Sequence, residues 1–188
     1  MTSKCYLGVG IYESYLDNLP KYLEAMKPFE TRQFIIADSI QEFNRSIRDG
    51  EEVEELSEEI LHTYGNVADE NRIELIRWDE FAERGNFKKI YDFLRNLYNE
   101  DPDFRERVRR VPYRKTGTPT DHDSINEISE YCLSSIGVTM TKCSDGFAKI
   151  ADWKERQEDK ITRGVANRIC KELGMTARTS DMEFVYID

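Results

Sequence analysis

The chain has 188 residues, of which 39% are hydrophobic, enough apolar material for one compact core. Its 27 basic and 37 acidic residues give a formal net charge of −10. This excludes a protein that binds nucleic acid through a surface that is basic throughout, but it does not exclude a local basic patch. No apolar run approaches the roughly 18 residues of a membrane span, and the first residues lack the apolar stretch of a signal peptide. We therefore expect a cytoplasmic chain with no membrane contact, folded as one domain over residues 1–188.

Strand-like and helical patterns alternate along the chain. Short apolar runs predict strands at 5–11, 32–38, 72–77, 146–152 and 182–187. Helical spacing of apolar residues predicts helices at 16–26, 40–48, 51–61, 78–82, 86–100, 104–111, 124–135 and 160–173. Asp101 and Pro102 form a helix-start signal, Gly174 a helix-end signal, and residues 111–121 read as a loop. This alternation predicts an α/β fold with a mostly parallel sheet covered on both faces.

The cysteines and histidines form no pattern typical of a metal site. None of the four cysteines belongs to a C-x-x-C pair, and the two histidines stand alone. No metal is expected, and the thiols are predicted to be free. Cys132 is interpreted as a small core residue rather than a nucleophile.

The end of the first strand is a candidate ligand site, because ligands of parallel sheets bind at the carboxyl ends of the strands. Gly8 and Gly10 would let a ligand approach the backbone closely. A polar turn follows and would line the crevice with Tyr12, Glu13, Ser14 and Tyr15. The dinucleotide fingerprint fails because Glu13 replaces its third glycine, and no P-loop is present. The alternative is that both glycines only pack the strand against a helix.

Asp38 follows the second strand and has two interpretations. It either contacts the ligand or caps the next helix, and the Asp-Ser pair favours the cap.

Residues 104–115 form a basic patch with a local charge of +5, from six basic residues and one acidic residue. Its candidate phosphate-binding residues are Arg105, Arg109, Arg110, Arg114 and Lys115. The alternative is a solvated face that pairs with the Glu-rich helix at 51–59.

The helix at 124–135 places Glu127, Tyr131 and Ser135 on one face at helical spacing. That face would form a polar pocket wall with Tyr131 as a hydrogen-bond donor. Alternatively, the apolar face of this helix is buried and the polar stripe lies in water.

Several blocks, taken in order, resemble the tRNA-dependent cyclodipeptide synthases. Residues 8–16 (GVGIYESYL) resemble the family's first strand and turn, and residues 34–40 (FIIADSI) its second strand. Residues 73–104 match in order and spacing, and residues 128–136 resemble the helix that carries a Tyr and a Glu. Together these blocks cover most of the chain.

The resemblance implies a Rossmann-like three-layer fold similar to the catalytic domain of class I aminoacyl-tRNA synthetases. It also implies aminoacyl-tRNA as substrate and partner, no cofactor, and a diketopiperazine of secondary metabolism as product. In the family, a Ser at the end of the first strand accepts the first aminoacyl group. A Tyr and a Glu on the later helix hold the substrate's amino group. Whether this chain forms a homodimer stays open.

The chain departs from the family pattern at the functional positions. Gly10 stands where the family has its nucleophilic Ser, Glu13 where it has Asn, and Ser135 where it has Glu, whereas Tyr131 matches. Glycine has no side chain, so acyl transfer to position 10 is impossible. Candidate catalytic positions are therefore Gly10, Glu13, Ser14, Tyr131 and Ser135. Candidate substrate contacts are Gly8, Tyr12, Tyr15, Asp38 and Glu127.

Three interpretations follow. In the first, the chain is an aminoacyl-tRNA-dependent transferase in which Ser14 or Cys5 replaces the nucleophile, or the acceptor amine attacks the ester directly with Glu13 as base. In the second, it is a non-catalytic relative that binds aminoacyl-tRNA or a small ligand. In the third, it is a protein-interaction domain with the acidic 51–59 face as its partner surface.

Overall fold

A five-stranded, all-parallel sheet forms the centre of the molecule in the computed structural model, which describes residues 2–10, 13–38, 53–111, 122–152, 155–175 and 179–187. Side chains within these ranges are described except at 13–15, 53–57, 122–128 and 179. The strands are β1 (Lys4–Val9), β2 (Thr31–Ile36), β3 (Glu74–Arg77), β4 (Phe147–Asp152) and β5 (Phe184–Ile187). They lie in the order β3-β2-β1-β4-β5, which confirms the predicted parallel sheet.

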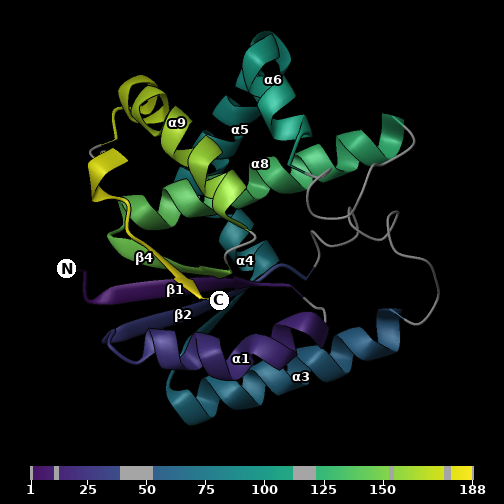
Figure 1. Ribbon diagram of the computed structural model, residues 1–188, viewed down its shortest axis with the longest axis vertical. Helices are drawn as coiled ribbons and strands as arrows, with labels where there is room; N and C mark the ends of the chain where they lie inside the picture. Colours follow the sequence, from purple (N-terminus) through teal and green to yellow (C-terminus); the bar gives the residue numbers. More distant parts are fainter. Residues whose placement is uncertain are drawn as a thin grey trace.

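Helices cover both faces of this sheet and produce three layers (Figure 1). One face carries α1 (Glu13–Met26) and α3 (Val53–Asn71). The other face carries α4 (Trp78–Ala82), α5 (Gly85–Glu100), α6 (Pro102–Arg109), α8 (His122–Ser144) and α9 (Arg156–Leu173). A short 3-10 turn, Thr179–Asp181, precedes β5.

The two faces of β1 serve different layers, because successive strand residues point in opposite directions. Cys5, Leu7 and Val9 are buried in the core beneath the sheet, against α1 and α3. Tyr6 points into the opposite layer, where it joins aromatic residues of α4 and α5. Both faces are buried, as expected for a parallel sheet.

The start of α6 confirms the predicted capping signal. The Asp101 carboxylate accepts hydrogen bonds of 3.0 Å from the backbone N–H groups of Asp103 and Phe104. The bond from the Phe104 N–H lowers the pKa of Asp101, since it favours the charged carboxylate. Pro102 occupies the first helical position, where no backbone donor is needed.

The helices differ from their predicted bounds mostly by one to three residues, as where α1 begins at Glu13 and α6 spans Pro102–Arg109, but three of them are longer by four residues or more. The predicted 51–61 helix continues to Asn71, and the predicted 124–135 helix continues to Ser144. The additional residues of α8 include Gly137, Val138 and Thr139, which have low helix propensity but are buried. Tertiary packing, rather than propensity, therefore keeps this part of the chain helical. The predicted 160–173 helix begins earlier, at Arg156, and ends as expected before Gly174, which has φ +65°. The helix predicted at 40–48 and residues 112–121 lie outside the described residues.

All four cysteines are free, as predicted, and all are buried, as was predicted for Cys132. Cys5 lies beneath the sheet, whereas Cys132, Cys143 and Cys170 belong to the core above it. Among the described residues, no group of three or more His, Cys, Asp or Glu side chains is arranged to hold a metal ion. In the same part of the chain, no helix is both long and apolar enough to cross a membrane.

Candidate functional site

A pocket lies at the carboxyl ends of β1 and β4, where the strand order reverses. Ligands of open parallel sheets bind at this kind of position. The pocket is narrow, with a cavity volume of about 50 Å³. Its described lining residues are Tyr6, Gly8, Val9, Ile35, Ala37, Trp78, Tyr131, Ser134, Ser135, Val138, Thr139, Lys149, Glu155 and Glu158.

Gly8 keeps this pocket open. A Cβ atom added at Gly8 would have no heavy atom within 4 Å, so packing does not require a glycine there. The alternative that Gly8 only packs its strand against a helix is therefore not supported. Gly10 is buried at the end of β1, and its carbonyl oxygen lies 3.5 Å from the Tyr64 hydroxyl.

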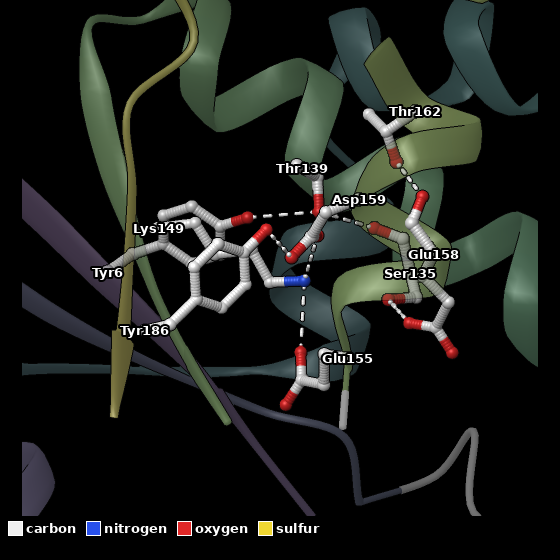
Figure 2. Close-up of polar contacts among 9 residues, drawn as sticks. All are labelled: Tyr6, Ser135, Thr139, Lys149, Glu155, Glu158, Asp159, Thr162 and Tyr186. Carbon is white, nitrogen blue, oxygen red and sulfur yellow. Dashed lines mark hydrogen bonds and ion pairs between the residues drawn. The ribbon is translucent and has the colours of Figure 1, made fainter. Parts of the chain in front are cut away.

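A buried ammonium group, that of Lys149 on β4, belongs to the pocket lining. Figure 2 shows it between the carboxylates of Glu155 and Asp159. Its Nζ lies 2.8 Å from Asp159 Oδ1 and 3.0 Å from Glu155 Oε2, and the Tyr186 hydroxyl donates to Asp159 Oδ2 at 2.9 Å. Burial alone lowers the pKa of Lys149, but the attraction of Glu155 and Asp159 outweighs it and raises the pKa well above its usual value. Lys149 is therefore held as a cation and is not a nucleophile.

Two sets of hydrogen bonds made by hydroxyl groups lie along the α8 wall (Figure 2). The Tyr6 hydroxyl lies 3.1 Å from Thr139 Oγ1, which donates to the Ser135 carbonyl at 2.9 Å. Ser135 Oγ donates to Glu158 Oε2 at 2.9 Å, so α8 and α9 are joined at the pocket. Glu158 is 3% exposed and lines the pocket, which places a carboxylate beside the space for a ligand.

The polar groups in Figure 2 have an acidic balance. One ammonium, that of Lys149, is set among the carboxylates of Glu155, Glu158 and Asp159. Interactions between charges are stronger where water is excluded. The pocket therefore suits a ligand that brings a positively charged group, such as an α-ammonium.

Three of the predicted site residues meet in this pocket, namely Gly8, Tyr131 and Ser135. Glu13 and Ser14 lie in the first turn of α1, directly after β1, but their side chains lie outside the described set. The same holds for the side chains of Tyr15 and Glu127, and Tyr12 lies outside the described residues altogether.

The structure places Asp38 at the start of α4. One carboxylate oxygen accepts from the Trp78 backbone N–H at 3.1 Å, and the other pairs with Arg77. Asp38 thus satisfies the first N–H of a helix distant in sequence, and it is not among the described residues that line the pocket.

The predicted basic patch is divided in the structure. Arg105 donates to the Asn99 carbonyl at 3.1 Å, and Arg109 donates to the Tyr98 hydroxyl at 2.9 Å. Arg110 pairs with Glu106, and Arg114 and Lys115 lie outside the described residues. The described arginines of α6 and the described part of the Glu-rich helix, which includes Glu58 and Glu59, lie on opposite faces of the sheet (Figure 1).

Lys149, Glu155 and Glu158 line the pocket but were not among the predicted site residues. Lys149 interrupts an otherwise apolar strand pattern, which is the one local signal for a buried charge. Cys5, named above as a possible nucleophile, is fully buried on the other face of the sheet, and burial raises its pKa to about 12. It cannot serve as the acyl acceptor.

Comparisons with known proteins show the fold. No family model and no curated protein matches the chain. A cyclodipeptide synthase structure from Fluoribacter dumoffii is 13% identical, covers 98% of this chain and 88% of its own, and has a TM-score of 0.67. The fold is Rossmann-like.

Two further structures support the same conclusion. A cyclodipeptide synthase from Streptomyces noursei is 11% identical, covers 100% of this chain and 96% of its own, and has a TM-score of 0.62. Tyrosyl-tRNA synthetase from Archaeoglobus fulgidus, complexed with L-tyrosine, is 16% identical, covers 95% of this chain and 54% of its own, and has a TM-score of 0.64. The predicted likeness to the catalytic domains of class I aminoacyl-tRNA synthetases is thus confirmed at the level of the fold.

Proposed function

We propose that the chain is an aminoacyl-tRNA-dependent aminoacyltransferase that forms a peptide bond, in the manner of a cyclodipeptide synthase but without an acyl-enzyme at position 10. The observation that carries this proposal is the acidic pocket at the junction of β1 and β4, with Glu155 and Glu158 in its lining. An aminoacyl ester carries an α-ammonium group, which complements that lining. The fold shared with enzymes of aminoacyl-tRNA chemistry supports the same substrate class.

The transfer step needs no covalent enzyme intermediate. The α-amine of one aminoacyl group attacks the ester carbonyl carbon of the other, so that a C–N bond forms and the C–O bond to the tRNA ribose breaks. The amine gives a proton to a carboxylate, and the ribose oxygen takes one up. A second attack, by the free amine of the dipeptidyl-tRNA on its own ester carbonyl, forms the second C–N bond and breaks the C–O bond to the remaining ribose. The ribose oxygen takes up the proton that the amine loses, and the cyclic product is released. The ester is already activated, so positioning plus a base suffices.

The residues have distinct roles in this scheme. Gly8 leaves room for the acyl group, and Glu158, oriented by Ser135, holds the ammonium. Tyr131 lies on the same wall as a hydrogen-bond donor. Glu13 is the base, because the first turn of α1 follows the β1 residues that line the pocket.

Product profiling tests this function. The natural chain, Gly10→Ser, Glu158→Gln and an empty vector are expressed in a bacterial host, and the culture media are compared by mass spectrometry. We expect dipeptide or cyclic dipeptide masses from the natural chain and at least about tenfold less from Glu158→Gln, which keeps the Ser135 hydrogen bond but loses the charge. The absence of product from all variants, each verified as folded, would contradict the proposal.

Gly10 favours a second candidate, a non-catalytic protein that holds an aminoacyl-tRNA end. In that case the natural chain yields no product, whereas Gly10→Ser restores one because only the acyl acceptor is missing. Protection of an aminoacyl-tRNA ester from hydrolysis by the natural chain would support this candidate directly.

A further inference from the structure

A groove between α6 and α9 carries three positive charges. Its described lining residues are Arg107, Arg110 and Val111 at the end of α6, and Gln157, Lys160 and Ile161 on α9. None of these is acidic, although the chain as a whole has a net charge of −10. The groove is therefore a local exception to the acidic character of the protein.

The basic side chains lie along the groove rather than pointing away from it. A Cβ atom added at Gly164 would lie 3.6 Å from Arg107 Nη1, so this guanidinium lies against α9. Lys160 is exposed one helical turn before Gly164. Arg110 Nε lies 2.9 Å from a Glu106 carboxylate in an exposed ion pair, and such pairs exchange readily for another anion.

One helix connects this groove with the acidic pocket. Gln157, Lys160 and Ile161 share one face of α9 and line the groove. Glu158 lies on the face that lines the pocket and bonds to Ser135 on α8. The two sites are thus separated by about the width of a helix, ~10 Å.

We propose that the groove between α6 and α9 binds the phosphate backbone of the tRNA whose aminoacylated end enters the pocket. This inference rests on the proposed function and names the surface through which its substrate is held. Phosphates at Arg107, Arg110 and Lys160 would place the adjoining end of the strand beside the first turn of α9. Arg105 and Arg109 are not among the described residues that line this groove, whereas Arg107, which donates to the Asp103 carbonyl at 3.3 Å, and Arg110 are.

The lining favours a nucleic acid over an acidic protein segment. Arginine guanidinium groups bind phosphate through paired N–H donors. Arg107 and Arg110 supply two such guanidinium groups to the groove. Val111 and Ile161 are buried, at 4% and 8% exposed, and form the floor of the groove, so the basic side chains and Gln157 supply its accessible surface.

The test is RNA binding by the full chain, measured by fluorescence anisotropy with a labelled, unacylated tRNA transcript over a range of salt concentrations. The variant replaces Arg107, Arg110 and Lys160 with Gln, which removes charge but introduces no repulsion. The matched control replaces Lys27, Lys88 and Lys89 with Gln, at exposed positions away from the groove. A Glu version of the groove variant strengthens the effect, and thermal melting verifies that every variant is folded.

We expect the groove variant to bind on the order of 50-fold more weakly near 0.15 M salt, with a salt slope smaller by about 2. These values follow from ~0.7 of a counterion released for each of three phosphate contacts. The control should bind like the natural chain. Equal losses in both variants, no loss in the groove variant, or no tRNA binding by the natural chain would each overturn the proposal. Equally tight binding of polyglutamate would assign the groove to an acidic protein instead.

Two further results separate this inference from the proposed function. Glu158→Gln should bind the tRNA normally while it loses product, because the pocket and the groove lie on different faces of α9. If product forms and the groove variant still binds tRNA, the function stands and the groove assignment fails. If the groove variant loses tRNA binding but no variant yields product, the groove stands and the transferase proposal fails.

Discussion

The Ser135 hydroxyl on α8 and the Glu158 carboxylate on α9 meet at 2.9 Å in the wall of the pocket. In the family that the sequence resembles, a Glu occupies the position of Ser135. Here a carboxylate lies beside the same position, but it comes from another helix. That part of the pocket therefore has an acidic group although residue 135 is a serine.

Ser135→Glu should destabilise the protein because it places two carboxylates at hydrogen-bond distance. We expect the free energy of unfolding at pH 7 to fall by about 2–3 kcal/mol, as measured by urea denaturation. Like-charge repulsion raises the pKa of one carboxyl, so the loss should shrink as pH falls toward 4 and that group becomes protonated.

The exchange variant Ser135→Glu/Glu158→Ser should recover most of that stability at pH 7, because one carboxylate and one hydroxyl meet again. Asn96→Glu, at an exposed position of α5, serves as the control and should change stability by less than about 0.5 kcal/mol. An exchange variant as unstable as the single variant would show that repulsion is not the cause.

Lys149→Met should cost about 3–5 kcal/mol of unfolding free energy, because it leaves the Glu155 and Asp159 carboxylates without their shared ammonium. Lys89→Met, at an exposed position, is the control. The folded-state pKa of Lys149 is raised, so its stabilisation is complete below about pH 10.5 and is lost only as pH rises further. A loss below about 1 kcal/mol at pH 7 would contradict this account.

Lys142 should have the opposite dependence on pH. Burial lowers its pKa to about 8, although Nζ bonds to Gln33 and lies 4.5 Å from the centre of the Phe147 ring. Between pH 8 and 10.5 the unfolded chain binds the additional proton, so stability rises with pH through this group. Relative to Lys142→Met, the natural chain should gain about 2 kcal/mol between pH 8 and 10 in urea denaturation. A constant difference across that window would refute the shift.

Two helical glycines should respond in opposite directions to alanine. A Cβ atom at Gly137 would lie 2.9 Å from Phe87 Cε2, so Gly137→Ala forces the ring to move and should lower stability by about 1 kcal/mol net. A Cβ atom at Gly65 meets nothing within 4 Å, and Gly65→Ala should raise stability by about 0.5–1 kcal/mol. Thermal melting of both variants tests this prediction. Melting temperatures that shift in the same direction for both variants would contradict it.

Gly8→Val should reduce product formation without loss of stability. The new side chain enters the pocket, where no atom lies within 4 Å of the Cβ position, and valine suits a strand better than glycine does. We expect an unchanged or higher melting temperature together with a large fall in product. A lower melting temperature would mean that Gly8 is required for packing.

The sheet was predictable because each strand is a short apolar run, and a buried parallel strand needs no alternation. The start and end of helices were predictable where one residue makes the cap, as at Asp101 and Gly174. The position of the pocket was predictable because ligands of parallel sheets bind at the carboxyl ends of the strands, where Gly8 lies. Tyr131 and Ser135 were predictable from the polar face of their helix.

The charged base of the pocket was not predictable from local pattern. In the sequence, Glu158 and Asp159 resemble the solvent-exposed first turn of a helix, but both are buried. Lys149 on β4 and Tyr186 on β5 bond to Asp159. Ser135 bonds to Glu158. These partners lie 10 to 27 residues away in sequence. These residues come together only in the folded sheet and its covering helices. The spacing of residues within one helix therefore could not predict the contacts.

The four buried thiols lie on both sides of the sheet, so the opening of the two helical layers can be measured separately. Cys5 lies beneath the sheet, whereas Cys132, Cys143 and Cys170 lie above it. None can react with an alkylating reagent until its own layer opens, since each is at most 9% exposed. Pulsed alkylation followed by peptide mass analysis would therefore time the opening of each layer, with no label added to the chain. Equal rates at all four positions would mean that the sheet and both helical layers open as one cooperative unit.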